Sequence, residues 1–79
     1  MSWDKKLSRP LVLKDGMRLE TLSDVRAAFI HRFANITYSM PLAHAGTLLI
    51  KAAETGKRAD IDAATDQIER VLRMNRVMR

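Results

Sequence analysis

Hydrophobic and polar positions change their period along the chain, and these changes predict a hairpin followed by three helices. Apolar residues flank Asp15-Gly16 on both sides: Leu11, Val12 and Leu13 before it, and Met17 and Leu19 after it. An Asp-Gly pair between apolar runs is typical of a two-residue type I′ turn, in which both central residues take positive φ. The pattern therefore predicts an antiparallel hairpin with Pro10 at the start of its first strand, where a missing N–H is tolerated.

A two-residue turn also predicts how the two strands pair. It places Val12 opposite Leu19 and Leu13 opposite Arg18. The first strand is then apolar on both faces, because Leu11 and Leu13 lie on the face that carries the charged residues of the second strand. We expect a second copy of the chain to cover that face, since an exposed apolar strand invites pairing. The alternative is that the third helix folds back and covers it within a single copy.

Residues 21–33 have the period of a first helix. Thr21 and Asp24 have the spacing of a capping box, with Asp in place of the usual Glu. The apolar positions that follow recur on one helix face, at Leu22, Val25, Phe29 and Phe33. We expect this face to be buried, and Arg26 and His31 to point away from it.

Two further helices follow. The second has Pro41 at its first position and ends at Gly56, a residue suited to a helix C-terminus. Its apolar face consists of Leu42, Ala45, Leu49, Ala52 and Ala53. The third has Asp60 as its N-cap. Its apolar face consists of Ile61, Ala64, Ile68, Val71 and Leu72. We interpret Gly46, inside the second helix, as a point of close helix packing.

This order of elements predicts an α+β fold, with an N-terminal two-stranded antiparallel hairpin packed on three helices. The domain is expected over residues 10–79, after an extension over residues 1–9. A chain of 79 residues buries a modest core. It has no cysteine, and its two histidines are too few for a histidine-based metal site. Association between copies is the expected additional source of stability.

Charge adds one question about the C-terminus. The net charge is +5, and four arginines recur at every third position, Arg70, Arg73, Arg76 and Arg79. Such a spacing drifts by about 60° per step around a helix, so these residues do not line one face. Asp66 and Glu69 precede Arg70 and Arg73 by four residues, the better orientation for helical ion pairs.

We interpret this segment as a solvated helix face that ends in a basic tail. The main alternative is an arm that contacts nucleic-acid phosphates through Arg73, Arg76 and Arg79. A helix that lies on a membrane surface is the third interpretation.

Candidate chemistry is sparse. The sequence has no phosphate-binding glycine loop, nucleophile elbow or paired-histidine zinc motif. His31 and His44 fall opposite the apolar faces of their helices, which predicts surface positions. Asp60, Asp62 and Asp66 are explained by capping and ion pairing rather than by a metal. We therefore expect no enzymatic activity, cofactor or metal.

Aromatic residues allow two interpretations. Trp3 and Tyr38 either close the edge of the core or anchor an interface, where aromatic residues are enriched. The candidate interface residues are thus Trp3, Leu11 and Leu13, toward a second copy or an unknown protein partner. The chain shows neither a signal peptide nor a membrane-length apolar run, so we expect a cytoplasmic protein with no membrane contact.

Three segments carry a resemblance when they are taken together. They are "RPLVLKDG" at residues 9–16, "LETLSDVRAAFIHRF" at residues 19–33 and "AHAGTLLIKAAETGKRADIDAATDQIERVL" at residues 43–72. Together they resemble a family of short bacterial proteins, domain-of-unknown-function family 982. That family commonly continues its first helix into a tryptophan-proline pair, where this chain has Phe33-Ala34. The resemblance implies a compact α+β fold and a bacterial cytoplasmic origin. It implies no catalytic residue, because the family has no established activity.

These observations favour a non-enzymatic interaction module that forms a homodimer. The alternative is a nucleic-acid-associated regulator that uses the basic helical surface. Salt-sensitive binding to unrelated duplex DNA would favour the regulator. A molecular mass that depends on concentration, without affinity for DNA, would favour the interaction module.

Overall fold

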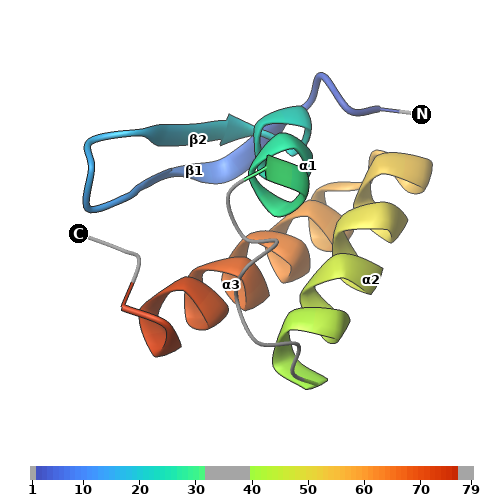
Figure 1. Ribbon diagram of the computed structural model, residues 1–79. Coiled ribbons are helices and arrows are strands. Elements are labelled where there is room, and N and C mark those ends of the chain that lie inside the picture. The colour runs from blue at the N-terminus through green and yellow to red at the C-terminus, as the bar shows by residue number, and fades with distance from the viewer. Residues whose placement is uncertain (1, 32–39, 77–79) are drawn as a thin grey trace.

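A computed structural model describes residues 2–31 and 40–76, which form a two-stranded antiparallel sheet and three helices (Figure 1). The strands are β1 (Lys6–Val12) and β2 (Arg18–Thr21), and the helices are α1 (Leu22–His31), α2 (Met40–Thr55) and α3 (Arg58–Met74). Helices α2 and α3 lie side by side, and the hairpin packs across α3 (Figure 1). The predicted α+β fold, a hairpin followed by three helices, is confirmed.

The hairpin turn differs from the predicted two-residue turn. The Leu13 N–H donates to the Met17 carbonyl at 2.8 Å, and the Gly16 N–H donates to the Leu13 carbonyl at 2.9 Å. Residues 14–16 therefore form a three-residue loop, in which Gly16 takes a φ of +88° and Asp15 does not take a positive φ. A glycine with positive φ at the third position is common in three-residue hairpin loops. The type I′ prediction was wrong.

The longer loop shifts the pairing of the two strands by one residue. Leu11 and Leu13 therefore share a face with Leu19 and not with Arg18. Leu11 lies opposite Leu19, and Val12 lies opposite Arg18. Leu11, Leu13 and Leu19 are at most 1% exposed and belong to one core. The predicted second apolar face is therefore absent from the described hairpin. Leu11 and Leu13, which we expected in an interface, are instead buried inside the chain.

Strand β1 begins at Lys6, four residues before the predicted start at Pro10. The four added residues belong to the segment that we assigned to an N-terminal extension. The strand pairing is irregular between Lys6 and Leu11. Pro10 lies within this irregular stretch, where its lack of an N–H costs no ladder hydrogen bond. Leu7, only 7% exposed, extends the buried face of the strand toward its start.

The residues before β1 are hydrogen-bonded to the helices. The Ser2 N–H donates to the Ala53 carbonyl at 2.6 Å, near the end of α2. The Trp3 carbonyl accepts from the Ser23 N–H at 2.8 Å, in the first turn of α1. These two bonds join the start of the chain to both helices and place Trp3 beside them.

Thr21 and Asp24 form the predicted capping box at the start of α1. The Asp24 N–H donates to Thr21 Oγ1 at 3.1 Å, and the Thr21 N–H donates to Asp24 Oδ2 at 3.1 Å. The same carboxylate oxygen accepts from the Glu20 N–H at 2.9 Å. The helix buries Leu22, Val25 and Ala28, and Phe29 packs partly buried against the core. Phe33 and Tyr38, which we assigned above, lie outside the described residues.

The two long helices bury the predicted faces. Helix α2 buries Ala45, Leu49, Ala52 and Ala53, while Leu42 is partly buried. Helix α3 buries the five predicted apolar residues together with Thr65. Gly56 ends α2 with a φ of +64°, and its N–H donates to the Ala52 carbonyl at 2.8 Å, as its predicted role requires. None of the helices in the described part of the chain has the length and apolarity that crossing a bilayer demands.

Two details of these helices were predicted wrongly. Helix α3 begins at Arg58, with Lys57 rather than Asp60 as its N-cap, and Asp60 lies in its first turn. The Asp60 carboxylate accepts a hydrogen bond from the Thr55 hydroxyl at 2.5 Å. Gly46 is not a point of close packing among the described residues, because a Cβ added there would have none of their atoms within 4 Å beyond its own turn of helix.

The two glycines Gly16 and Gly46 are expected to respond oppositely to substitution. Gly16→Val should lower the free energy of unfolding by more than about 1 kcal/mol, because a β-branched residue takes positive φ at a cost. Gly46→Ala should raise it by about 0.5–1 kcal/mol, because the site is helical and open. Urea unfolding at low protein concentration measures both. An unchanged midpoint for Gly16→Val would contradict the assigned turn.

Candidate functional site

An apolar groove of about 450 Å³ lies between α1 and α2. Phe29 and Ile30 line it from α1, and Leu49 and Ile50 line it from α2. Phe29 and Leu49 reach the core, whereas Ile30 is 56% exposed and Ile50 is 49% exposed. The groove therefore has an apolar base and two isoleucines that project into solvent beside it.

The bottom of the groove is open at Gly46. This residue lines the groove, and no other part of the described chain comes within 4 Å of the place where its Cβ would lie. Gly46 and Ile50 are four residues apart in α2, so they are neighbours on one helix surface. A hollow and a projecting side chain thus lie next to each other on the same helix.

Trp3 and Arg26 complete the lining of the groove. The Arg26 guanidinium carbon lies 5.1 Å from the centroid of the Trp3 ring, a cation–π contact that orients the indole. Trp3 is partly buried against the core. Of the three residues that we expected in an interface, Trp3 lines this groove, and Leu11 and Leu13 do not.

The sequence contains a signal for the groove that lies outside the predicted apolar faces. Ile30 and Ile50 each directly follow a predicted core residue, Phe29 and Leu49. An isoleucine at such a position widens the apolar face of its helix beyond what one packed neighbour covers. The same widening on two helices that prove to be adjacent marks an apolar surface between them.

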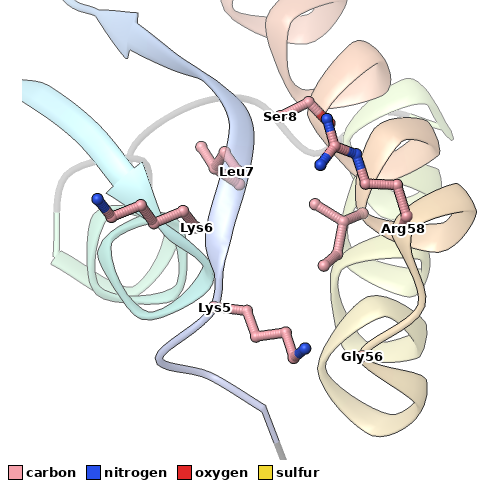
Figure 2. A pocket seen from close by; sticks show the side chains of 7 residues that line it. Lys5, Lys6, Leu7, Ser8, Gly56 and Arg58 are labelled. Carbon is pink, nitrogen blue, oxygen red and sulfur yellow. The ribbon is translucent and has the colours of Figure 1, made fainter.

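A second cavity, of about 400 Å³, lies between β1 and the start of α3 (Figure 2). Lys5 and Arg58 contribute positive charge to its lining, and Leu7 and Ile61 contribute apolar surface. Lys6 also borders the cavity. In Figure 2 the Lys5 side chain extends toward the α3 side of the cavity, and the Arg58 guanidinium lies near Ser8. The Lys6 amine points away, to the opposite side of β1.

Gly56 lets Lys5 approach the helices closely. A Cβ added to Gly56 would lie 3.2 Å from Lys5 Cε and 3.0 Å from Ser2 Oγ. This glycine therefore ends α2 and also leaves room for the lysine side chain at the edge of the cavity. Any larger residue would push that side chain away.

One carboxylate lies beside the cavity. The Ser8 hydroxyl donates to Asp62 Oδ1, and Arg58 Nε lies 3.7 Å from the same oxygen. No acidic residue in the described ranges pairs with Lys5 or Lys6. The side chains around the cavity therefore carry an excess of positive charge.

A network of ion pairs joins β1 to α3 on the exposed side of the helix. Arg9 Nη2 lies 2.9 Å from Asp66 Oδ1 and 2.5 Å from Glu69 Oε1. Arg73 lies 3.3 Å from the other oxygen of Glu69, as predicted. Asp66 pairs with Arg9 and not with Arg70, as far as the described residues show. The hydrogen bond from Arg9 is the main cause that lowers the pKa of Glu69, and Arg73 adds to it.

The C-terminal arginines do not form one cationic surface in the described part of the chain. Arg73 contacts Glu69, whereas Arg76 lies beyond the end of α3 with a φ of +56°. Arg79 lies outside the described residues. His31 and His44 are exposed, as predicted. In residues 2–31 and 40–76, no group of three or more His, Asp or Glu side chains could hold a metal ion.

Comparison with protein families, with curated proteins and with solved structures finds no match to this chain. The resemblance to family 982 stays an interpretation of the quoted motifs. The features of the described chain that bear on function are the groove between α1 and α2, the cavity between β1 and α3, and the ion pairs on α3.

Glu69 should make stability depend on pH. Its pKa in the folded chain is lowered, so its contribution is complete above the usual carboxyl pKa of about 4.3 and is lost as the pH falls through the lowered value. Glu69→Gln should lower the free energy of unfolding at pH 7 by up to about 1 kcal/mol, because the pair is partly exposed. Below the lowered pKa, the variant and the parent chain should be equally stable.

Urea unfolding across the acidic range measures this difference. Glu54→Gln is the matched control, because Glu54 is exposed on α2 and pairs with no described residue. It should leave stability unchanged at every pH. A Glu69→Gln effect that persists unchanged in acid would mean that packing, and not the charge, is responsible.

Proposed function

We propose that the chain is a non-enzymatic interaction module that forms a homodimer through the groove between α1 and α2. One observation carries the proposal: two projecting isoleucines and an empty hollow at Gly46 lie on the same surface. A two-fold dimer brings the same surface of each copy together. Ile50 of one copy then enters the hollow at Gly46 of its partner, and the reverse contact forms at the same time.

The physical gain comes from covering apolar surface. Ile30 and Ile50 are each about half exposed, and burying such side chains is worth about 25 cal/mol per Å² of apolar area. Most other large apolar side chains in the described ranges are already buried or partly buried. A chain of 79 residues without cysteine gains stability from such contact.

Trp3 and Arg26 fit the rim of such an interface. Tryptophan and arginine are the residue types most enriched among side chains that dominate binding energy. Their cation–π contact holds both side chains in place before association, which lowers the entropy cost of ordering them. Trp3 therefore keeps the interface role that the sequence indicated, at a different surface.

Nucleic-acid binding through the C-terminal arginines has weaker support. Arg73, the one of the three candidates that lies within α3, contacts the carboxylate of Glu69. An arginine held by a carboxylate must lose that contact before it reaches a phosphate.

A cysteine-free chain suits a reducing compartment, which supports the cytoplasm as the place where the module acts.

Light scattering and sedimentation equilibrium over a wide concentration range test the dimer. Ile50→Lys should weaken association by at least about 30-fold, the change expected when a side chain central to an interface is lost. Gly46→Leu should weaken it similarly, because leucine fills the hollow. Leucine also has the higher helix propensity, so the isolated chain should be at least as stable as before. The two readouts thus separate lost association from lost folding.

Met74→Lys is the matched control, because Met74 is 61% exposed and lies at the end of α3, outside the groove. It should leave the affinity between copies unchanged. A parent chain that has the mass of one copy at the highest concentrations would contradict the homodimer. So would equal dissociation by Met74→Lys and Ile50→Lys.

A further inference from the structure

We infer that the cavity between β1 and the start of α3 binds a small molecule through one phosphate group. This site is separate from the proposed dimer groove, which lies between α1 and α2. The inference starts from two cationic side chains, Lys5 and Arg58, that come from distant parts of the sequence and border the same cavity (Figure 2).

The two cations suit one doubly charged group. Lys5 offers an ammonium with three donors, and Arg58 offers a planar guanidinium that can donate to two oxygens of a phosphate at once. Neither lysine of the lining pairs with a carboxylate in the described ranges, so Lys5 brings an uncompensated charge. Arg58 approaches Asp62 only through Nε, at 3.7 Å, which leaves its terminal nitrogens to donate.

The backbone also fixes where Lys5 lies. Gly56 leaves room for the Lys5 side chain, whose Cε comes within 3.2 Å of the place a Cβ would take. Trp3 and Ser2, just before this lysine, are hydrogen-bonded to α1 and α2 through their backbones. A lysine whose chain is anchored on both helices loses less entropy on binding than one on a free segment.

The size of the cavity selects the kind of phosphate. A volume of about 400 Å³ is within the usual range for small-molecule sites. Leu7 and Ile61 give it apolar surface for the body of a ligand. A nucleic-acid backbone presents a row of phosphates and is bound by a row of cations. Here two cations flank one hollow, so a single phosphate on a small molecule fits better.

The Asp62 carboxylate lowers the net positive charge around the cavity. Its carboxylate accepts from the Ser8 hydroxyl and lies near Arg58, so it reduces the positive potential on that side. The Ser8 hydroxyl donates its proton to Asp62, so it does not donate to the ligand. Asp60, in the first turn of α3, is held by Thr55 and lies 3.8 Å from Lys51. The charges that face the cavity still sum to a positive value.

A titration of the full chain with inorganic phosphate, followed by amide NMR shifts, tests the site. Shifts should concentrate at Lys5, Ser8 and residues 57–59 and should saturate in the millimolar range. Lys5→Gln and Arg58→Gln should each weaken binding by about tenfold or more, the loss of one charge-assisted hydrogen bond. Both side chains are exposed, so thermal unfolding should show that the variants still fold.

Lys6→Gln is the matched control. It removes the same charge from the neighbouring residue, whose amine points to the other side of β1 (Figure 2). It should change the affinity by less than about twofold if the contact is a directed hydrogen bond and not general attraction.

Three results would overturn the inference. The first is the absence of shifts near the cavity at any phosphate concentration reached. The second is an equal loss of affinity in Lys6→Gln and Lys5→Gln, which would mean unspecific charge attraction. The third is a duplex oligonucleotide that shifts the same amides at a lower phosphate concentration than inorganic phosphate does, which would assign the site to nucleic acid.

Discussion

The contact between β1 and α3 is the constraint on which the other features depend. One edge of β1 pairs with β2, and the other edge faces the helix, where the Ser8 N–H donates to Thr65 Oγ1 at 3.1 Å. Thr65 is fully buried, and its hydroxyl donates in turn to the Ile61 carbonyl at 2.8 Å. A buried hydroxyl is costly without partners, so this pair of bonds fixes the strand at one height along the helix.

The ion pairs of Arg9 and the location of the cavity both follow from where β1 lies on α3. Once Ser8 is held at Thr65, the next residue, Arg9, reaches the carboxylate of Asp66, directly after Thr65, and that of Glu69, one turn further along α3. In the other direction, Lys5 comes to lie beside the start of the helix. Arg9 in β1 is therefore neutralised by α3, whereas Lys5, directly before β1, is not neutralised and borders the cavity.

Features set by neighbouring residues could be predicted from the sequence, and features set by distant ones could not. The capping box of Thr21 and Asp24, the glycine at the end of α2 and the buried helix faces depend on spacings of three or four residues. The predicted hairpin register was wrong because a glycine with positive φ is found in three-residue loops as well as in two-residue turns. The choice between them depends on where the core needs Leu11 and Leu13, which only the helices decide.

Contacts between distant residues also explain why the sequence patterns did not predict the ion pairs of Arg9 or the groove between α1 and α2. Arg9 and Glu69 are separated by 60 positions, so the expected partner of Asp66 was taken from its own helix. The groove required α1 and α2 to be adjacent, which the separate helix patterns do not state. A pattern reports which face of an element is apolar, whereas only the packing of elements shows which part of that face stays uncovered.

The Asp24 carboxylate has a consequence for how the sheet ends. A two-stranded sheet offers two edges to which strands of other molecules could add, the usual route to aggregation. Along β2, the Glu20 N–H is occupied by Asp24 Oδ2, and along β1, the Ser8 N–H is occupied by Thr65. An incoming strand would have to displace a charged acceptor on one side and a whole helix on the other. The carboxylate that caps the start of α1 therefore also protects the hairpin from open-ended strand addition.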